Sequence, residues 1–410
     1  MRLLQVLVAA LLLWSPQPPA RTVLQFGHLW DGSRMLDAVV VVVEADRIVS
    51  VTPGQKAAAA GAVDLRGYTA IPGLIDLHTH VTYYWDRRPE TRPLGGPRRR
   101  PAVTVFLAQD NARRTLETGV TTIRDLGAAA ETDFAMRDLV AMGAMIGPRM
   151  FVAGQGISAS RGAAPDPDAM RKLVDERIKS GSDWIKVYAS RGSFDSVDTT
   201  QTITFDEMKA IVEAAHAQNR KVAIHSYGPS GVKDAVRAGA DSIEHGIDLD
   251  DETLAEMARR GTVWVPTIDH NRYYVDAKDE FGFKPDAIPP LEAYIAKNLA
   301  SAARAFKAGV RLGMGSDAVF SMFGQNTREL EWFVKAGLTP AQALATATTT
   351  AAELLDRKDR LGRIAPGFIA DIVAIEGKPL ENIRDVVTGV RWVMKDGVAV
   401  VERRRPASGR

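Results

Sequence analysis

The sequence predicts an α/β protein: a (β/α)8 TIM barrel that carries a small β-sandwich domain built from both chain ends. Three observations lead to this fold class. Apolar strands alternate with helical stretches through the middle of the chain, both ends are rich in strands, and polar residues stand where the middle strands end. The chain has 410 residues, 46% of them hydrophobic, which is enough to bury a large core.

The first 20 residues have the pattern of a secretory signal peptide. Met1 and Arg2 give a positive start, an apolar run follows over residues 3–14, and Pro-rich residues lead to Ala20. The run is too short to span a bilayer comfortably. Pro18 stands where cleavage prefers a small residue, so a retained N-terminal anchor is the alternative. With no cysteine, disulfides and a cysteine-linked lipid anchor are excluded. We expect a periplasmic or secreted protein with no stable membrane span after cleavage.

Both ends of the mature chain contain short β-rich segments separated by turns. These segments are residues 38–43, 47–51, 371–375 and 389–394. Residues 395–397, Lys-Asp-Gly, have the composition of a hairpin turn. We expect residues 21–70 and 364–402 to form one small β-sandwich domain, followed by a basic C-terminal tail over residues 403–410.

The middle of the chain, residues 71–363, is predicted to form the barrel. A capping box at Thr204–Glu207 predicts a helix that runs toward Gln218, and Thr339–Pro340 predicts a helix over residues 341–355. The predicted strands are the segment of His78 and residues 122–126, 150–153, 184–188, 222–225, 242–245, 263–266 and 312–315. Eight such units in a β-then-α order close into a barrel, with its chemistry at the carboxyl ends of the strands.

His78 and His80 are the most informative residues of the chain. They end the apolar segment Ile-Pro-Gly-Leu-Ile-Asp-Leu-His-Thr-His over residues 71–80. Strand side chains alternate between faces, so the two imidazoles point to the same side, about 6–7 Å apart. Two neutral imidazoles placed in this way can hold a divalent metal.

Further candidate ligands follow later strands. His225 and His245 each end an apolar run, and Asp317 follows the last strand in Gly-Ser-Asp. A single histidine or aspartate at such a place is commonly structural, but their joint placement with the His78–His80 pair favours a metal site. Asp317 could also contact the attacking water and serve as general base.

Lys186 lies inside the apolar strand Trp-Ile-Lys-Val-Tyr over residues 184–188. A buried, unpaired ammonium is costly, so burial lowers the pKa of such a lysine. The neutral amine can take up CO2 and become a carbamate, whose two oxygens can bridge two metals. The alternative is a lysine that reaches from the strand end to solvent.

The remaining histidines and the charge pattern are less specific. We interpret His28 and His216 as structural, whereas His270 follows the seventh strand, where it could contact a substrate. The net charge of +2 does not suggest nucleic acid as a partner. The arginines within residues 87–100 form either a solvated loop or a rim that attracts anionic substrates.

Five motifs together resemble the metal-dependent amidohydrolase superfamily, and more narrowly its Xaa-Pro dipeptidase (prolidase-like) and imidazolonepropionase-related branch. They are Pro-Gly-Leu-Ile-Asp-Leu-His-Thr-His, Ile-Lys-Val-Tyr, Ile-His-Ser-Tyr, Ile-Glu-His-Gly and Gly-Ser-Asp-Ala. The resemblance runs from about Thr22 to Val401.

This resemblance implies a binuclear zinc site. His78, His80 and Asp317 would hold one metal and His225 and His245 the other, with N6-carboxylated Lys186 and a hydroxide bridging them. The carbamate would require CO2 or bicarbonate, and Co2+ or Mn2+ could replace zinc on these ligands. Tyr227 resembles the tyrosine of the family that donates a hydrogen bond to the developing oxyanion, with a core tyrosine as the alternative.

One region departs from the family pattern. Relatives often carry Gly-Gly-His-Gly after the third strand, thought to help hold the carboxylate of the substrate, but residues 156–162 read Gly-Ile-Ser-Ala-Ser-Arg-Gly. Arg161 could take this task, because a guanidinium pairs with a carboxylate through two hydrogen bonds.

We therefore expect a zinc-dependent hydrolase that cleaves a dipeptide or an N-acyl amino acid, including ochratoxin-type amides, and releases a C-terminal amino acid. The substrate would be a small molecule or dipeptide with a carboxylate, and the protein could form a homo-oligomer. The alternatives are a cyclic-amide hydrolase, deaminase, lactonase or phosphotriesterase on the same barrel and, more remotely, a non-catalytic interaction protein.

Overall fold

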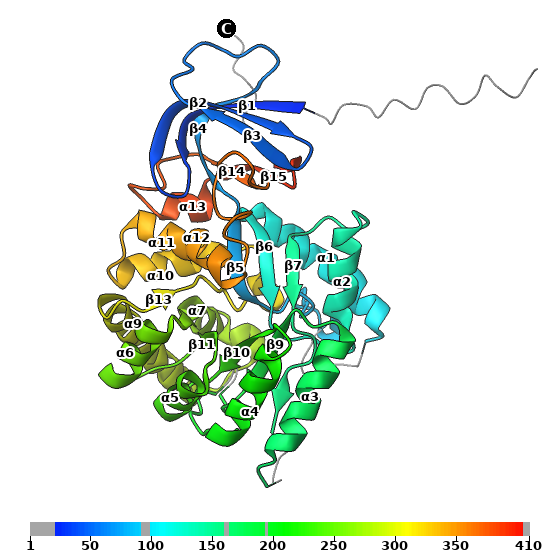
Figure 1. Cartoon of the computed structure of the whole chain (residues 1–410), viewed down its shortest axis with the longest axis vertical. Coiled ribbons are helices and arrows are strands. Elements are labelled where there is room, and N and C mark those ends of the chain that lie inside the picture. Colours follow the sequence, from blue (N-terminus) through cyan, green and yellow to red (C-terminus); the bar gives the residue numbers. More distant parts are fainter. Residues whose placement is uncertain (1–20, 92–98, 160–163, 193–195, 405–410) are drawn as a thin grey trace, which may run out of the picture.

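The computed structural model describes residues 21–91, 99–159, 164–192 and 196–404. A sheet formed by the two ends of the chain lies above a larger body of parallel strands and helices (Figure 1). Two of the predicted features, the signal peptide over residues 1–20 and Arg161, lie outside the described residues, as does most of the basic tail.

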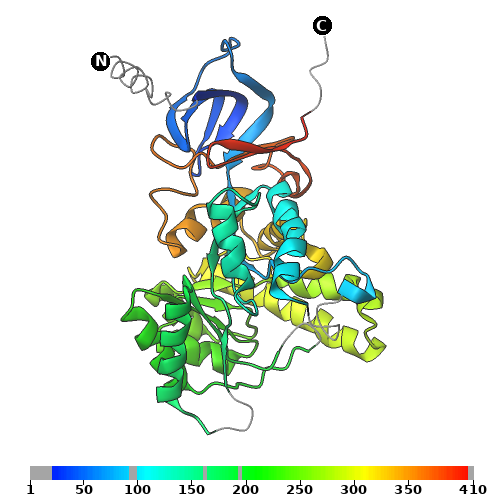
Figure 2. The same cartoon turned by 90° about the vertical axis from the view of Figure 1, so that its right-hand side faces the viewer.

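The upper sheet has seven strands in the order β16-β15-β14-β4-β1-β2-β3. The strands are β1 (Arg21–Trp30), β2 (Met35–Glu44), β3 (Arg47–Thr52), β4 (Val63–Pro72), β14 (Ile372–Ile375), β15 (Val390–Lys395) and β16 (Val398–Glu402). Strand β4 pairs parallel with β1 and antiparallel with β14, and so joins the two chain ends (Figure 2). Pairing is continuous through all seven strands, so the predicted sandwich of two packed sheets is not confirmed.

Alternating burial explains why these segments form a sheet. In β2, Val39, Val41 and Val43 are buried while the valines between them are half-exposed, which is the period of two expected of a strand with one covered face. The buried face packs on Phe26 and Trp392. Between β15 and β16, residues 396 and 397 have φ angles of 50° and 77°, as the predicted hairpin turn requires.

The body contains two parallel sheets. The first has the order β5-β6-β7, and the second has the order β13-β12-β11-β10-β9-β8. Their strands are β5 (Leu74–Thr79), β6 (Val120–Asp125), β7 (Arg149–Val152), β8 (Ile157–Ser158), β9 (Trp184–Tyr188), β10 (Lys221–His225), β11 (Ser242–Glu244), β12 (Val263–Val265) and β13 (Arg311–Leu312). All eight predicted strands are present with slightly different bounds, and β8 is an additional short strand.

Strand pairing does not close the two sheets into one ring among the described residues. The chain after β13 contacts β5 through bonds from Leu77 N to the Met314 carbonyl (2.9 Å) and from His80 N to the Ala318 carbonyl (3.1 Å). This segment approaches β5 so closely that a Cβ on Gly315 would lie 2.9 Å from the Cβ of His78. The prediction of an α/β protein is confirmed, whereas the closed barrel is not.

Helices cover the parallel strands. They are α1 (Pro101–Glu117), α2 (Thr132–Ala141), α3 (Pro167–Ser180), α4 (Phe205–His216), α5 (Pro229–Ala238), α6 (Asp251–Arg260), α7 (Ile268–Asp276), α8 (Lys278–Phe281), α9 (Ile288–Lys307), α10 (Glu329–Lys335), α11 (Pro340–Thr346), α12 (Thr349–Leu354) and α13 (Arg384–Thr388). Short 3-10 helices span Pro89–Thr91, Pro285–Ala287, Phe320–Met322 and Asn326–Arg328. None of the helices in the described residues has the length and apolar character needed to cross a membrane.

Two helix predictions can be compared with the structure. The capping box that Thr204 and Glu207 form at the start of α4 is present. The helix predicted over residues 341–355 is instead divided into α11 and α12. At the break, the Ala347 carbonyl accepts a hydrogen bond from Ile75 N of β5 (2.7 Å), a donor far away in the sequence, and so bonds to the sheet and not within a helix.

Candidate metal centre

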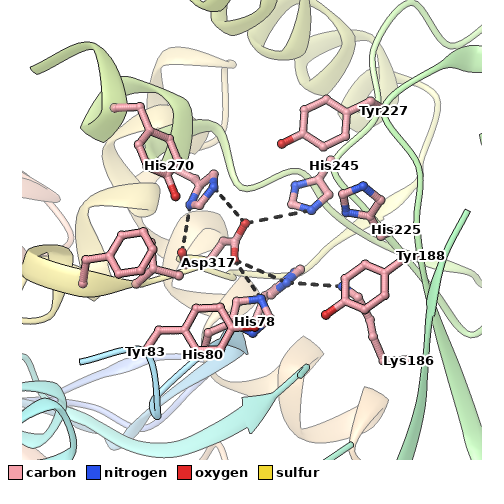
Figure 3. Close-up of a pocket in the computed structure, with 13 residues that line it drawn as sticks. His78, His80, Tyr83, Lys186, Tyr188, His225, Tyr227, His245, His270 and Asp317 are labelled. Atoms are coloured by element: carbon pink, nitrogen blue, oxygen red, sulfur yellow. Dashed lines mark hydrogen bonds and ion pairs between the residues drawn. The ribbon is translucent and has the colours of Figure 1, made fainter. Parts of the chain in front are cut away.

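The polar residues at the carboxyl ends of the parallel strands converge on one pocket (Figure 3). Strands β5, β9 and β10, the segments that follow β11 and β13, and helix α7 each contribute to it. The pocket is lined by His78, His80, Tyr83, Lys186, Tyr188, His225, Tyr227, His245, His270, Tyr274, Asp317, Val319 and Phe320. All six residues predicted to bind metal, together with Tyr227 and His270, therefore lie in one pocket.

His78, His80 and Asp317 form a compact set of candidate ligands. One ligand atom from each lies within 4.8 Å of the other two, and all three residues are buried. Asp317 Oδ1 is 3.3 Å from His80 Nε2 and 3.5 Å from His78 Nε2. Two imidazole nitrogens and a carboxylate oxygen facing one point are a donor set suited to zinc.

Each of the four histidines predicted to bind metal is held by a hydrogen bond at one ring nitrogen. His80 Nδ1 donates to the Gly127 carbonyl (2.9 Å) and His225 Nε2 donates to the Gly192 carbonyl (2.9 Å). Nδ1 of His78 is 2.8 Å from Glu244 Oε2, and Nδ1 of His245 is 2.6 Å from the Thr267 hydroxyl. In each case the second ring nitrogen is left for a metal, and the carbonyl and carboxylate acceptors fix the tautomers of His78, His80 and His225.

Burial acts against the charged form of each imidazole and so favours the neutral state that a metal ligand needs. It lowers the pKa of His78 to about 4, and with the nearby Lys186 and His225 it holds the pKa values of His225 and His245 well below the usual range. Burial alone would raise the pKa of Asp317, but His270, His78 and His80 hold it well below the usual range. The pKa of His80 is instead raised, because burial is outweighed there by the hydrogen bond and charge of Asp317. The centre thus offers three imidazoles whose neutral form is favoured, His80 paired with Asp317, and a negative carboxylate.

Lys186 is buried beside these ligands, 1% exposed, with its Nζ 3.4 Å from His78 Nε2. Burial lowers the pKa of its amine to about 8. Among the described residues, no carboxylate forms a salt bridge with it. The side chain points into the pocket, which is the outcome expected of a functional lysine and not of one that reaches solvent.

His270 and Tyr227 border the same carboxylate and imidazoles. Both ring nitrogens of His270 face Asp317: Nδ1 donates to its main-chain carbonyl (2.8 Å), and Nε2 is 3.2 Å from Oδ2. Tyr227 is 1% exposed and its ring stacks on His245, with centroids 4.9 Å apart. Neither residue lies on the outer rim.

The weaker sequence candidates lie elsewhere. His28 pairs with Asp37 in the upper sheet, and His216 pairs with Asp241 at the end of α4, so both are outside the pocket. In the basic loop, the Arg87 guanidinium pairs with Glu280 at 3.0 Å.

Three buried charges escaped the sequence analysis. Arg124 of β6 donates to Glu244 Oε1 (2.8 Å), while the other oxygen of Glu244 bonds to His78. Asp76 of β5 accepts hydrogen bonds from the main chain and hydroxyl of Ser316, at 2.9 and 2.6 Å, and so fixes the residue next to Asp317. The sequence does contain a signal for these residues: each charge lies inside an apolar strand, and a charged residue there needs a buried partner.

Comparisons with known proteins agree with this geometry. The sequence profile of the amidohydrolase family matches residues 69–400. Ochratoxinase from Aspergillus niger is 28% identical over an alignment 355 positions long, which covers 77% of this chain and 71% of that protein. Imidazolonepropionase from Streptomyces griseus is 26% identical over 90% of this chain and 93% of that one. The crystal structure of a Xaa-Pro dipeptidase with bound methionine in the active site superimposes with a TM-score of 0.84 and 29% identity, covering 93% of this chain and 99% of that chain.

Proposed function

The chain belongs to the amidohydrolase family, in its prolidase-like branch, and is a hydrolase of C–N bonds; from this premise we propose that it is a binuclear zinc amidase. It would cleave dipeptides or N-acyl amino acids and release a C-terminal amino acid. One observation carries the proposal: four histidines, Lys186 and Asp317 line a single buried pocket.

In the proposed centre, His78, His80 and Asp317 would hold one metal, and His225 and His245 would hold the other. Lys186 would contribute carbamate oxygens to the centre, once its neutral amine has bonded to the carbon of CO2 and released a proton. The low pKa of the Lys186 amine and its position beside His78 support this modification. When bound, the two cations would supply electrostatic activation of a water molecule and of the substrate carbonyl.

The residues of the chain then perform the proton transfers. Asp317 accepts the proton of the attacking water at a carboxylate oxygen and passes it to the leaving amine. The hydroxyl of Tyr227 donates a hydrogen bond to the carbonyl oxygen as negative charge develops there. His270 holds Asp317 in place through its two contacts with that residue. We therefore assign His270 first to positioning Asp317 and only second to the expected contact with the substrate.

The class of substrate rests on the relatives. Two of them are a Xaa-Pro dipeptidase and an ochratoxinase, and both names are consistent with amide cleavage. The proposed partner of the substrate carboxylate is Arg161. The similarity to imidazolonepropionase favours a second candidate, a cyclic-amide hydrolase, which would need one metal only.

Metal content and a substrate screen test this function together. We expect about two zinc ions per chain by mass spectrometry, and release of free amino acid from dipeptides or N-acyl amino acids. One zinc ion with turnover of a cyclic amide alone would favour the second candidate. Turnover of only lactones or phosphotriesters would contradict both.

We also propose the features that frame this site. The two parallel sheets would belong to one (β/α)8 barrel over residues 71–363, with residues 21–70 and 364–402 as the small domain. Residues 1–20 would be cleaved as a signal peptide, leaving a periplasmic or secreted enzyme. Sequencing the N-terminus of protein recovered from the periplasm or medium tests the last point.

A further inference from the structure

One wall of the pocket is aromatic and uncharged. It consists of Tyr83, Tyr274, Val319 and Phe320, which we call the aromatic wall. Figure 3 shows Tyr83, the member of the wall that it labels, on one side of Asp317 and Lys186 on the other. The charged and metal-binding groups of the pocket all belong to its other described residues.

The rings of the wall pack against the histidines of the pocket and against one another. Tyr83 stacks on His80 with centroids 5.0 Å apart and planes inclined by 20°, and it is inclined by the same angle to Phe320 at 6.2 Å. Tyr274 meets His270 edge-on at 4.7 Å. The aromatic wall is therefore in direct contact with the candidate ligand His80 and with His270.

A second layer of rings holds the wall in position. Phe281 of α8 lies 5.7 Å from Phe320 and 5.3 Å from Tyr274. Trp85 meets Phe320 edge-on at 6.2 Å. Phe320 N also donates to the Tyr83 carbonyl (2.8 Å), which ties the two rings through the main chain. A wall supported in this way is pre-formed, as a binding surface must be.

The main chain at Phe320 indicates that its ring has a role. Its φ angle is 55°, in the left-handed region that glycine adopts freely and that an aromatic residue adopts only under strain. The fold nevertheless keeps a phenyl ring there, 3% exposed and lining the pocket. Strain of this kind persists where surrounding contacts over-determine it, commonly at functional sites.

We infer that the aromatic wall is a subsite for an aromatic group of the substrate, on one side of the scissile amide. This inference rests on the proposed function, since the amide must lie at the metal centre for the wall to flank it. A planar apolar group gains from burial and from contact with the rings, whereas a charged group would lose its hydration without finding a partner there.

Binding of reaction products tests the subsite without turnover. The zinc-loaded protein is titrated by calorimetry with benzoate against acetate, and with L-phenylalanine against L-alanine, so that each pair changes one side of the cleaved bond. We expect the aromatic member of one pair to bind at least about tenfold more tightly. Equal affinities within both pairs would overturn the inference.

Three leucine variants test whether the preference for aromatic ligands arises at the aromatic wall. Phe320→Leu and Tyr83→Leu keep an apolar side chain, and each is expected to reduce the aromatic preference about fivefold, with affinity for the small ligand within about twofold. Phe106→Leu is the control, because this ring is 70% exposed on α1 and does not line the pocket. An unchanged preference in both wall variants would also overturn the inference.

The hydrolysis assay keeps this inference separate from the proposed function. N-acetyl-L-alanine, N-acetyl-L-phenylalanine and N-benzoyl-L-alanine are assayed with the same protein. Hydrolysis of all three at similar kcat/KM, with no binding preference, would leave the amidase intact and refute the aromatic subsite. Binding preference without hydrolysis of any amide would refute the amidase, and with it a subsite beside a scissile amide, while showing that the wall binds aromatic groups.

Discussion

Nδ1 of His78 lies 2.8 Å from Oε2 of Glu244, and both side chains are buried, with exposures of 1% and 0%. The opposite oxygen of Glu244 accepts from Arg124, whose guanidinium lies over the Trp184 ring. The carboxylate is therefore shared between a fixed cation and the imidazole. This pair orients Nε2 of His78 toward Asp317 and makes the imidazole a better donor to a metal.

Replacing Glu244 should weaken the metal centre. In Glu244→Gln the charge that pairs with both Arg124 and His78 is lost, so we expect zinc affinity to fall by about 10–100-fold in competition with a chelator. Glu353→Gln is a control, because Glu353 is exposed and its salt bridge among the described residues is with Arg311. Equal zinc affinity in Glu244→Gln and the native protein would show that the buried carboxylate does not tune His78.

The candidate ligands were predictable because each combines a polar residue with an apolar run that fixes its place at a strand end. The pairing of Glu244 with His78 could not be predicted, since the partner of a buried charge depends on which strands become neighbours. The aromatic wall was also missed: Tyr83, Tyr274 and Phe320 come from the chain around three different strand ends, and only the folded chain brings them together. The hydrogen bond at the break after α11 likewise comes from a distant donor, Ile75 N.

Tyr227 is expected to act on the reaction and not on metal binding. Its ring is buried against His245, and its phenol is the donor we assign to the developing oxyanion. Removing one such donor costs about 10²–10³ in kcat, so Tyr227→Phe should lose activity to this extent while retaining full zinc content. Tyr273→Phe, which loses a hydroxyl bonded to Ser321 outside the pocket, should keep kcat. Turnover of Tyr227→Phe at the native rate would remove Tyr227 from the mechanism.

His270 should affect kcat more than KM, because its ring nitrogens both contact Asp317. An asparagine at this position can still donate to the Asp317 carbonyl, as Nδ1 does, whereas leucine cannot. We expect His270→Leu to reduce kcat about tenfold or more and His270→Asn to recover part of the loss, since one hydrogen bond contributes about 1 kcal/mol. Steady-state kinetics on one N-acyl amino acid separates the two constants. A rise in KM alone would instead identify His270 as a substrate contact.

Bicarbonate should control zinc uptake through Lys186. Protein stripped with a chelator and kept free of CO2 retains a free amine at this position, so we expect it to bind less than two zinc ions until bicarbonate is added. The carbamate carbon should then appear as a new carbonyl resonance when 13C-bicarbonate is used. Lys186→Met keeps the length and burial of the side chain but cannot be carboxylated, so its zinc uptake should not respond to bicarbonate.

Lys233→Met is the matched control, because the Lys233 amine is paired with Asp250 and Glu252 at the surface. Two zinc ions bound to native protein without bicarbonate, and with no labelled carbonyl, would mean that the amine beside His78 serves the centre without modification.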